Sequence, residues 1–351
     1  MRRALFILVS AVMLVPLFAA GGYYYFLHYM DRAGPLREPA QIVVPRGGTE
    51  AIGVTLAEAG VIDHPVLFIA AVKLTEIAGP LKAGEYAFSA AVSLTDVLKL
   101  LRDGKTVVHR MTLPEGVTSH QVVALLNAEP ALSGEIGEIP PDGALLPETY
   151  HFSRGDSRAA LLDRMRKAMS KALTDAWAAR AEGLPFDNSE QALVLASIVE
   201  KETGVASERA KVAGVFVNRL RQGMKLQSDP TTIYAMTQGK ADLGRPLTRA
   251  DWRIESPFNT YFADGLPPAP IANPGRAAIA AALNPEKHNL LSPTAPGVML
   301  SPPLWPSITR TFSAGATLRK SPKRFTENGF RSRQAMGPAM RSVAADRWRH
   351  S

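Results

Sequence analysis

Two glutamates at the end of one predicted helix are the residues best suited to acid–base chemistry. A helix is expected over the run QALVLASIVEKET, which Asn188 or Ser189 can cap. On a helical wheel Glu202 lies in the middle of the apolar stripe, whereas Glu200 lies outside it. Burial raises the pKa of a carboxyl group, which is what a general acid working near neutral pH requires. The pattern indicates Glu202 as a candidate general acid, and it fits a structural cap or a buried ion pair as well.

The surrounding pattern predicts an α+β protein. Short strands and helices alternate from Gln41 to about residue 105, and after a strand at 105–113 the chain becomes mainly helical, with a long amphipathic helix over 156–182. A composition of 46% hydrophobic and 21% charged residues excludes a disordered or polytopic membrane chain. Because the chain has no cysteine, disulfides, thiolate metal sites and a Cys nucleophile are excluded. The sequence also lacks a nucleotide-binding glycine loop and a metal-binding histidine pair.

The N-terminal segment predicts a membrane anchor. Residues 4–27 carry no charged side chain, and a helix of that length measures about 36 Å, enough to cross a bilayer core of about 30 Å. The run is longer than the apolar part of a secretory signal, and Tyr23 to Tyr25 suit an interfacial aromatic belt. We expect a cytoplasmic tip and a single transmembrane helix over 1–30, followed by a linker over 31–40.

Several motifs, in one order along the chain, resemble the MltG/YceG-like family of endolytic peptidoglycan transglycosylases. The longest is LASIVEKETGVASERAKVAGVFVNRLRQGMKLQSDPTTIYA over 195–235, and the others are KAGEYAF over 82–88, LPEGVT over 113–118, LLPETYHF over 145–152 and FNTYFADGLPPAPIANPG over 258–275. The resemblance runs from about residue 5 to His288. It implies a small LysM-like α+β module over 41–110 and a mainly helical catalytic domain with short strands over 111–288.

The resemblance implies a chemistry for Glu202 that agrees with its place on the wheel. In the family this glutamate protonates the glycosidic oxygen between MurNAc and GlcNAc of nascent glycan strands. It then takes the proton from the MurNAc 6-hydroxyl, which closes onto the anomeric carbon and leaves a 1,6-anhydro-MurNAc end. Because the nucleophile belongs to the substrate, no second carboxylate, metal or cofactor is expected.

The family also implies a location and partners. We expect a lyase in the bacterial inner membrane, held there by residues 4–27, with a cytoplasmic N-terminus and a periplasmic catalytic domain. Peptidoglycan glycan strands are the expected substrate, and peptidoglycan synthases of elongation or division are implied partners. The alternative is a membrane-tethered protein that binds peptidoglycan or assists cell-wall assembly without catalysis. The LysM-like module fits either glycan binding or a spacer.

Polar residues that follow Glu202 in the family motifs suit sugar hydroxyls and N-acetyl groups. A second helix is expected from Ser207 to Gly223, and Pro230 suits the first turn of another. The run at 265–268 could form a cleft wall or simply a rigid surface loop. Helix capping explains two of the candidates, at 229 and 231, equally well. The candidate substrate-binding residues are Asn218, Arg219, Gln227, Asp229, Thr231, Tyr234, Asn259 and Tyr261.

The C-terminal segment departs from the family. The family continues with a segment resembling Val-Ala-Asp-Gly-Thr-Gly-Gly-His, whereas residues 292–299 read SPTAPGVM. Writing the family segment in GC-rich codons and reading it one base out of frame reproduces SPTAPGVM, and a second family segment reproduces residues 304–309 in the same way. We interpret 289–351 as a frame-shifted tail and expect it to be disordered. The net charge of +8 arises from residue 310 onward, so no nucleic-acid partner is expected.

Overall fold

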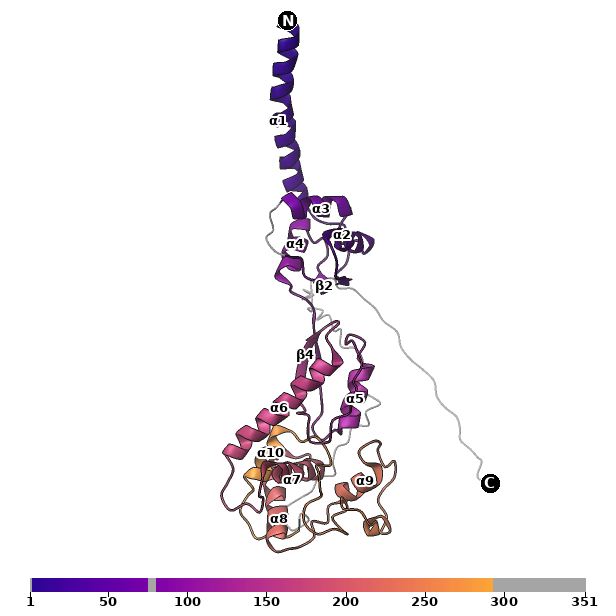
Figure 1. Cartoon of the computed structure of the whole chain (residues 1–351), viewed down its shortest axis with the longest axis vertical. Helices are drawn as coiled ribbons and strands as arrows, with labels where there is room; N and C mark the ends of the chain where they lie inside the picture. Colours follow the sequence, from indigo (N-terminus) through magenta and orange to yellow (C-terminus); the bar gives the residue numbers. More distant parts are fainter. Residues whose placement is uncertain (1, 75–79, 293–351) are drawn as a thin grey trace, which may run out of the picture. The chain divides into compact units, whose positions relative to one another are not determined.

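The computed structural model describes residues 2–74 and 80–292, with the backbone alone at 2–13 and 15 (Figure 1). This part of the chain contains helices and two sheets of two antiparallel strands each, which confirms the α+β class. Its buried apolar side chains form three clusters. The elements are α1 (Arg2–Asp31), β1 (Ala40–Val44), α2 (Thr49–Glu58), α3 (Pro65–Leu74), β2 (Gly84–Phe88), α4 (Leu94–Asp103), β3 (Val108–Thr112), α5 (Ser119–Ala128), β4 (Thr149–Ser153), α6 (Arg158–Ala178), α7 (Ser189–Glu202), α8 (Arg209–Arg221), α9 (Asp229–Thr237) and α10 (Arg276–Leu283), with short 3-10 turns η1 (Ala206–Glu208) and η2 (Asp251–Arg253).

The first cluster joins the β1–β2 pair to α2, α3 and α4. In the sheet Ile42 faces Tyr86, whose side chain is fully buried. α4 begins where the Ser93 side chain accepts a hydrogen bond from the Asp96 amide, and it ends at Gly104 in the left-handed conformation, where glycine carries no steric cost. These signals lie in the sequence itself, and the helix expected between them is present.

The second cluster lies between the β3–β4 pair, α5 and α6. β4 was not expected, because its five residues lie in a stretch that reads as mostly helical. Its burial alternates along the strand, and Tyr150 and Phe152 face the cluster. That alternation is typical of a half-buried strand, but over five residues it is a weak signal.

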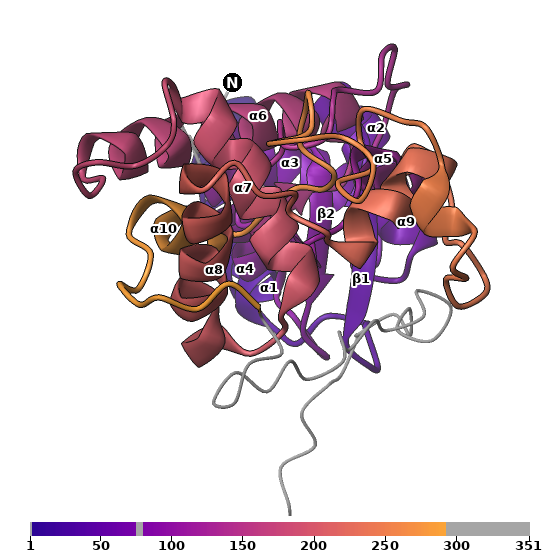
Figure 2. The same ribbon diagram turned by 90° about the horizontal axis from the view of Figure 1, so that it is seen from below.

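The third cluster packs α7 against α8 and α10 (Figure 1, Figure 2). Leu195, Ile198 and Val199 of α7 have no exposed surface, and Val212 of α8 and Ile279 of α10 are buried with them. The Asn188 side chain caps α7 by accepting a hydrogen bond from the Gln191 amide. This packing fixes the end of α7 that carries both glutamates.

The predicted membrane anchor is wrong. α1 is present, but no helix in the described part of the chain is long and apolar enough to cross a membrane. The inner-membrane location, with its cytoplasmic N-terminus and periplasmic catalytic domain, falls with it. The prediction rested on the absence of charged residues over 4–27, and that absence alone does not establish a membrane-spanning helix.

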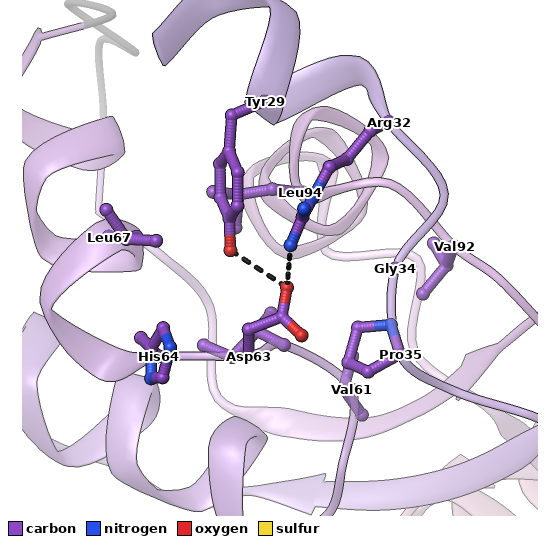
Figure 3. Close-up of a pocket in the computed structure, with 11 residues that line it drawn as sticks. Tyr29, Arg32, Gly34, Pro35, Val61, Asp63, His64, Leu67, Val92 and Leu94 are labelled. Atoms are coloured by element: carbon purple, nitrogen blue, oxygen red, sulfur yellow. Dashed lines mark hydrogen bonds and ion pairs between the residues drawn. The ribbon is translucent and has the colours of Figure 1, made fainter. Parts of the chain in front are cut away.

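The last turn of α1 also contacts the first cluster rather than continuing the apolar run. Met30 is buried in that cluster. Tyr29 and Arg32 both donate hydrogen bonds to the same Asp63 oxygen, Tyr29 at 2.9 Å, in a small pocket (Figure 3). The Asp31 carboxylate accepts from the Thr95 hydroxyl at 2.7 Å.

The described chain ends just beyond the last helix. Leu290 packs on the third cluster, and the backbone of 288–291 is hydrogen-bonded to α8. The predicted disorder over 289–351 is wrong for residues 290 and 291, which these contacts hold in place, and residues 293–351 lie outside the described part of the chain.

Candidate active site

Glu202 is the last residue of α7, and only one oxygen of its carboxylate accepts a hydrogen bond from a described residue. Thr203 adopts an extended conformation and ends the helix there. Glu202 Oε2 accepts a hydrogen bond from the Ser228 hydroxyl at 3.2 Å. Among the described residues no donor lies within hydrogen-bond distance of Oε1. The side chain is half-buried, so one oxygen is oriented by the protein and the other remains available to a ligand.

The electrostatic surroundings of Glu202 favour its protonated form. The pKa of Glu202 is raised to about 7, mainly by burial; the negative charge of Asp229 contributes to the rise, and the Ser228 hydrogen bond and Arg219 oppose it. A large share of this carboxyl group therefore carries its proton near neutral pH. A group that can donate and later accept a proton in that range is suited to general acid–base catalysis.

Ser228 is held in place by the loop at 259–260. Its backbone amide donates to the Thr260 hydroxyl at 3.0 Å, and the Gln227 amide donates to the Thr260 carbonyl at 3.1 Å. The Thr231 hydroxyl donates to the Ser228 carbonyl at 2.6 Å. Although Ser228 stands at the cap position of α9, its hydroxyl makes no capping bond. It is directed to Glu202 instead.

Asn218 and Arg219, at the end of α8, bind the chain's own backbone. Asn218 Nδ2 donates to the carbonyls of His288 and Leu290, at 2.6 and 3.2 Å. Arg219 is buried, with Nε donating to the Leu291 carbonyl at 2.6 Å and Nη1 to the Leu226 carbonyl at 2.6 Å. Arg219 thus joins the segment at 288–291 to the turn that leads to Ser228.

The remaining candidates divide by exposure. Asn259 and Thr231 have no exposed surface, and all their hydrogen bonds are internal. Gln227 and Asp229 are exposed beside Ser228, and Tyr261 is half-buried with its hydroxyl donating to Asp229 at 2.8 Å. Asp229 and Tyr261 are therefore in contact, and Gln227 and Asp229 flank Ser228 in the sequence.

Tyr234 belongs to a neighbouring contact. Its hydroxyl donates to Asp142 Oδ2 at 2.8 Å, and its ring packs against Phe258 at a centroid distance of 5.0 Å. The Asp142 carboxylate also accepts from the Ser119 amide, at 2.6 Å. Tyr234 thus links α9 to the start of α5 and stays half-buried.

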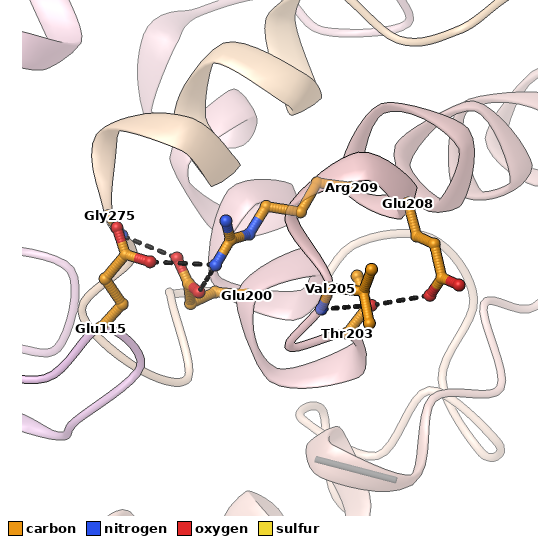
Figure 4. Close-up of polar contacts among 7 residues, drawn as sticks. All are labelled: Glu115, Glu200, Thr203, Val205, Glu208, Arg209 and Gly275. Atoms are coloured by element: carbon orange, nitrogen blue, oxygen red, sulfur yellow. Dashed lines mark hydrogen bonds and ion pairs between the residues drawn. The ribbon is translucent and has the colours of Figure 1, made fainter. Parts of the chain in front are cut away.

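Glu200 has a different environment, with both oxygens occupied (Figure 4). Oε1 pairs with Arg209 at 3.1 Å and Oε2 accepts from the Gly275 amide at 2.8 Å. Arg209 also pairs with Glu115 at 2.9 Å. A Cβ atom at position 275 would lie 1.9 Å from Glu115 Oε1, so any residue other than glycine would displace the Glu115 side chain. Burial raises the pKa of Glu200 too, but the group is locked into a cross-link between three motifs.

Lys201, between the two glutamates, contacts the turn at 114–116. Its Nζ donates to the Gly116 carbonyl at 3.2 Å. Burial lowers the pKa of Lys201 to about 7, against the opposing charges of Asp242, Asp142 and Glu200. Lys201 therefore fixes the LPEGVT turn onto α7.

Within residues 2–74 and 80–292, no three His, Asp or Glu side chains are grouped to hold a metal ion.

The stretch of chain that contains these site residues is similar to known proteins. Residues 42–291 match the sequence profile of the YceG-like family. The chain belongs to this family. A protein of Streptococcus pneumoniae D39 named "Endolytic murein transglycosylase" is 29% identical over 336 residues, which cover 81% of this chain and 60% of that protein. The YceG-like chain described here thus spans about 60% of the length of its pneumococcal relatives.

Two further relatives have lengths closer to this YceG-like chain. A Bacillus subtilis protein, also named "Endolytic murein transglycosylase", is 31% identical over 285 residues, which cover 71% of this chain and 77% of that protein. A crystal structure titled as a putative YceG-like protein from Listeria monocytogenes is 30% identical, covers 73% of this chain and 92% of that one, and has a TM-score of 0.42.

Sequence reasoning missed two groups of residues in this YceG-like protein. Ser228 precedes Asp229 and Pro230 at a helix start, so its hydroxyl reads as a cap. Arg209 and Glu115 lie in the recognised motifs, but the wheel placed their partner Glu200 off the apolar stripe. The wheel describes one helix, whereas segments remote in sequence bury Glu200.

Proposed function

We propose that this YceG-like protein is a lyase that cuts peptidoglycan glycan strands internally, as the names of its relatives suggest. The single observation that carries the proposal is the state of Glu202: a raised pKa, one oxygen held by Ser228 and one oxygen available. That combination suits a group that first donates and then accepts a proton.

The proposed reaction uses Glu202 twice. The protonated carboxyl donates to the glycosidic oxygen between MurNAc and GlcNAc, and that bond breaks with the electron pair leaving on the oxygen. The MurNAc 6-hydroxyl closes onto the anomeric carbon and gives its proton to the Glu202 carboxylate, which returns to its starting form. The product carries a 1,6-anhydro end. Because no water is activated, the locked carboxylate of Glu200 is not needed as a second catalytic group.

The substrate-binding residues are proposed in two roles. Gln227, Asp229 and Tyr261 are accessible beside Glu202, and we propose that they contact sugar hydroxyls or N-acetyl groups. We propose that Tyr234 lines the same surface from α9. The other four candidates form hydrogen bonds within the protein, and we propose that they hold this surface in place. Their direct contact with glycan stays a prediction. These residues are Asn218, Arg219, Thr231 and Asn259.

The domain organisation is proposed with the activity. We propose that 41–110 is a LysM-like module that binds glycan and that 111–288 is the catalytic domain. The separate apolar clusters on either side of residue 105 support this division. A spacer role for the module, and an association with peptidoglycan synthases, stay predictions.

Incubation of the purified full chain with purified peptidoglycan tests the activity. Mass spectrometry of the released muropeptides should reveal 1,6-anhydro ends that are absent with Glu202→Gln. The matched control is Glu200→Gln, the same substitution two residues away, which should still release them. Binding to peptidoglycan without release of anhydro products by the wild-type chain would identify a non-catalytic cell-wall protein and overturn the proposal.

A further inference from the structure

A stacked aromatic pair lies beside the Ser228–Glu202 contact, and one of its two residues, Trp252, has no role in the function proposed above. The rings of Trp252, in η2, and Tyr261 are nearly parallel, 5.2 Å apart between centroids with an interplanar angle of 18°. Both side chains are half-buried. The pair therefore presents part of a flat apolar surface to solvent.

Asp229 fixes the pair to the first residue of α9. Its Oδ1 accepts hydrogen bonds from Trp252 Nε1 at 3.1 Å and from the Tyr261 hydroxyl at 2.8 Å. Both polar groups of the aromatic pair are thereby satisfied within the protein. Asp229 Oδ2 accepts no hydrogen bond from any described residue, so one carboxylate oxygen next to the rings remains available.

The backbone that carries Trp252 is also fixed. Nδ2 of the buried Asn259 donates to the Trp252 carbonyl at 3.0 Å and to the Ile254 carbonyl at 2.8 Å. Next to Trp252, Asp251 is held by both terminal nitrogens of Arg245, at 2.7 and 2.9 Å. Little side-chain or loop entropy is left to lose on binding, which favours a preorganised contact surface.

The pair belongs to the surroundings of the proposed general acid. Asp229 directly follows Ser228, whose hydroxyl binds Glu202. The charges of Asp229 and Glu202 both raise the pKa of Tyr261, with burial as the largest cause. Tyr261, the ring partner of Trp252, therefore lies within electrostatic range of Glu202.

The chemistry of this surface selects a class of ligand. An aromatic face carries partial negative charge and attracts polarised C–H groups. A pyranose ring offers a flat face of such C–H groups with hydroxyls around its rim, and the adjacent Asp229 Oδ2 can accept from one hydroxyl. A purely apolar ligand would leave that carboxylate unpaired, which is costly.

We propose that Trp252 is a sugar-stacking residue and that, with Asp229 Oδ2, it forms a subsite for one pyranose ring of the glycan next to the bond that is cut. The inference rests on the proposed function, which supplies the glycan. It adds a residue outside the family motifs identified in the sequence.

Binding is tested separately from cleavage in full-length chains that carry Glu202→Gln. Calorimetric titration with a β-1,4-linked N-acetylglucosamine tetramer should give a Kd about tenfold higher with Trp252→Leu, which keeps an apolar side chain but removes the ring. Trp252→Tyr keeps a ring and should bind within about threefold of the parent. The matched control is Phe262→Leu, which should bind like the parent: Phe262 is an exposed aromatic residue that stacks on no other ring among the described residues.

A fluorescence measurement tests the role of Trp252 even if the leucine variant misfolds. The tetramer should change tryptophan emission in the parent, and Trp252→Phe should still bind while losing that change. Unaltered affinity of Trp252→Leu, or an equal loss with Phe262→Leu, would overturn the subsite. Anhydro products from the wild type together with an unaffected Trp252→Leu would remove the inference and leave the proposed function standing. Binding that depends on Trp252, without any cleavage by the wild type, would support the subsite and overturn the proposed function.

Discussion

Glu200 and Glu202 lie two residues apart on one helix, and burial raises the pKa of both, yet their surroundings differ. Glu200 has Arg209 on one oxygen and the Gly275 amide on the other. Glu202 has a single neutral donor, Ser228, and one oxygen without a partner among the described residues. Burial is enough to raise the pKa of a carboxyl group. Whether that group can also bind a substrate depends on how many of its oxygens already accept hydrogen bonds within the protein.

Replacing each carboxylate by its amide tests this difference most directly. Glu202→Gln keeps the volume and the Ser228 contact but has no acidic proton, so release of anhydro-muropeptides should fall by more than about 1000-fold. The melting temperature should stay within a few degrees. A Glu200→Gln chain that loses as much activity as this variant would reverse the assignment of the general acid.

Removing the one donor to Glu202 should have an intermediate effect. Ser228→Ala deletes a hydrogen bond that favours the charged carboxylate, so the pKa of Glu202 should rise above about 7. Turnover at pH 7 should fall about tenfold because the carboxyl group loses its orientation. The alkaline limb of the pH–rate profile, where Glu202 loses its proton, should move to higher pH. Ser256→Ala, in a nearby loop, serves as control, and an unmoved limb would disprove the role of Ser228.

Breaking the locked carboxylate should affect stability more than rate. Glu200→Gln leaves Arg209 without its buried charge partner and should lower the free energy of unfolding by about 2 kcal/mol. Activity of the folded chain should stay within about threefold. Urea unfolding measures the loss, with Glu115→Gln as the matched control: Glu115 is 41% exposed and should contribute less than about 1 kcal/mol. Equal losses for both variants would mean that burial of Glu200 carries no special weight.

The smallest expected effect is a pH dependence of stability. The folded chain keeps the Glu202 proton up to about pH 7, whereas the unfolded chain releases it near 4.5. This contribution to stability is fully present below pH 4.5 and is lost as the pH rises through 7. Between pH 5 and pH 6 the loss is about 1 kcal/mol, so the melting temperature of the wild type should fall by about 2–4 °C more than that of Glu202→Gln. Parallel curves for the two proteins would mean that the pKa of Glu202 is not raised.

The sequence predicted the features that depend on neighbouring residues. The caps at Asn188 and Ser93 and the apolar stripe of α7 are local, and the helices they predict are present. The apolar stripe alone indicates Glu202, without reference to its contact with Ser228. Pro230 was likewise expected in the first turn of α9, where it lies.

The features that were missed depend on residues far apart in the chain. Ser228 lies 26 positions after Glu202, and their contact requires the loop at 259–260 to hold the turn. The burial of Glu200 requires Glu115 and Gly275, which no helical wheel contains. The anchor prediction was also local and is wrong: it rested on the absence of charge over 4–27, and no helix among the described residues is long and apolar enough to cross a membrane.

The contacts made by Asn218 and Arg219 have a consequence for how freely the chain can vary. Both side chains bind main-chain carbonyls of 288–291, and every amino acid supplies such a carbonyl. Their hold on this segment is therefore indifferent to its side chains. A junction of this kind can accept new sequence without losing its attachment, and the match to the YceG-like family ends here, at residue 291. A library randomised at Asn289 and Leu291 should consequently retain far more functional members than one randomised at Asn218 and Arg219.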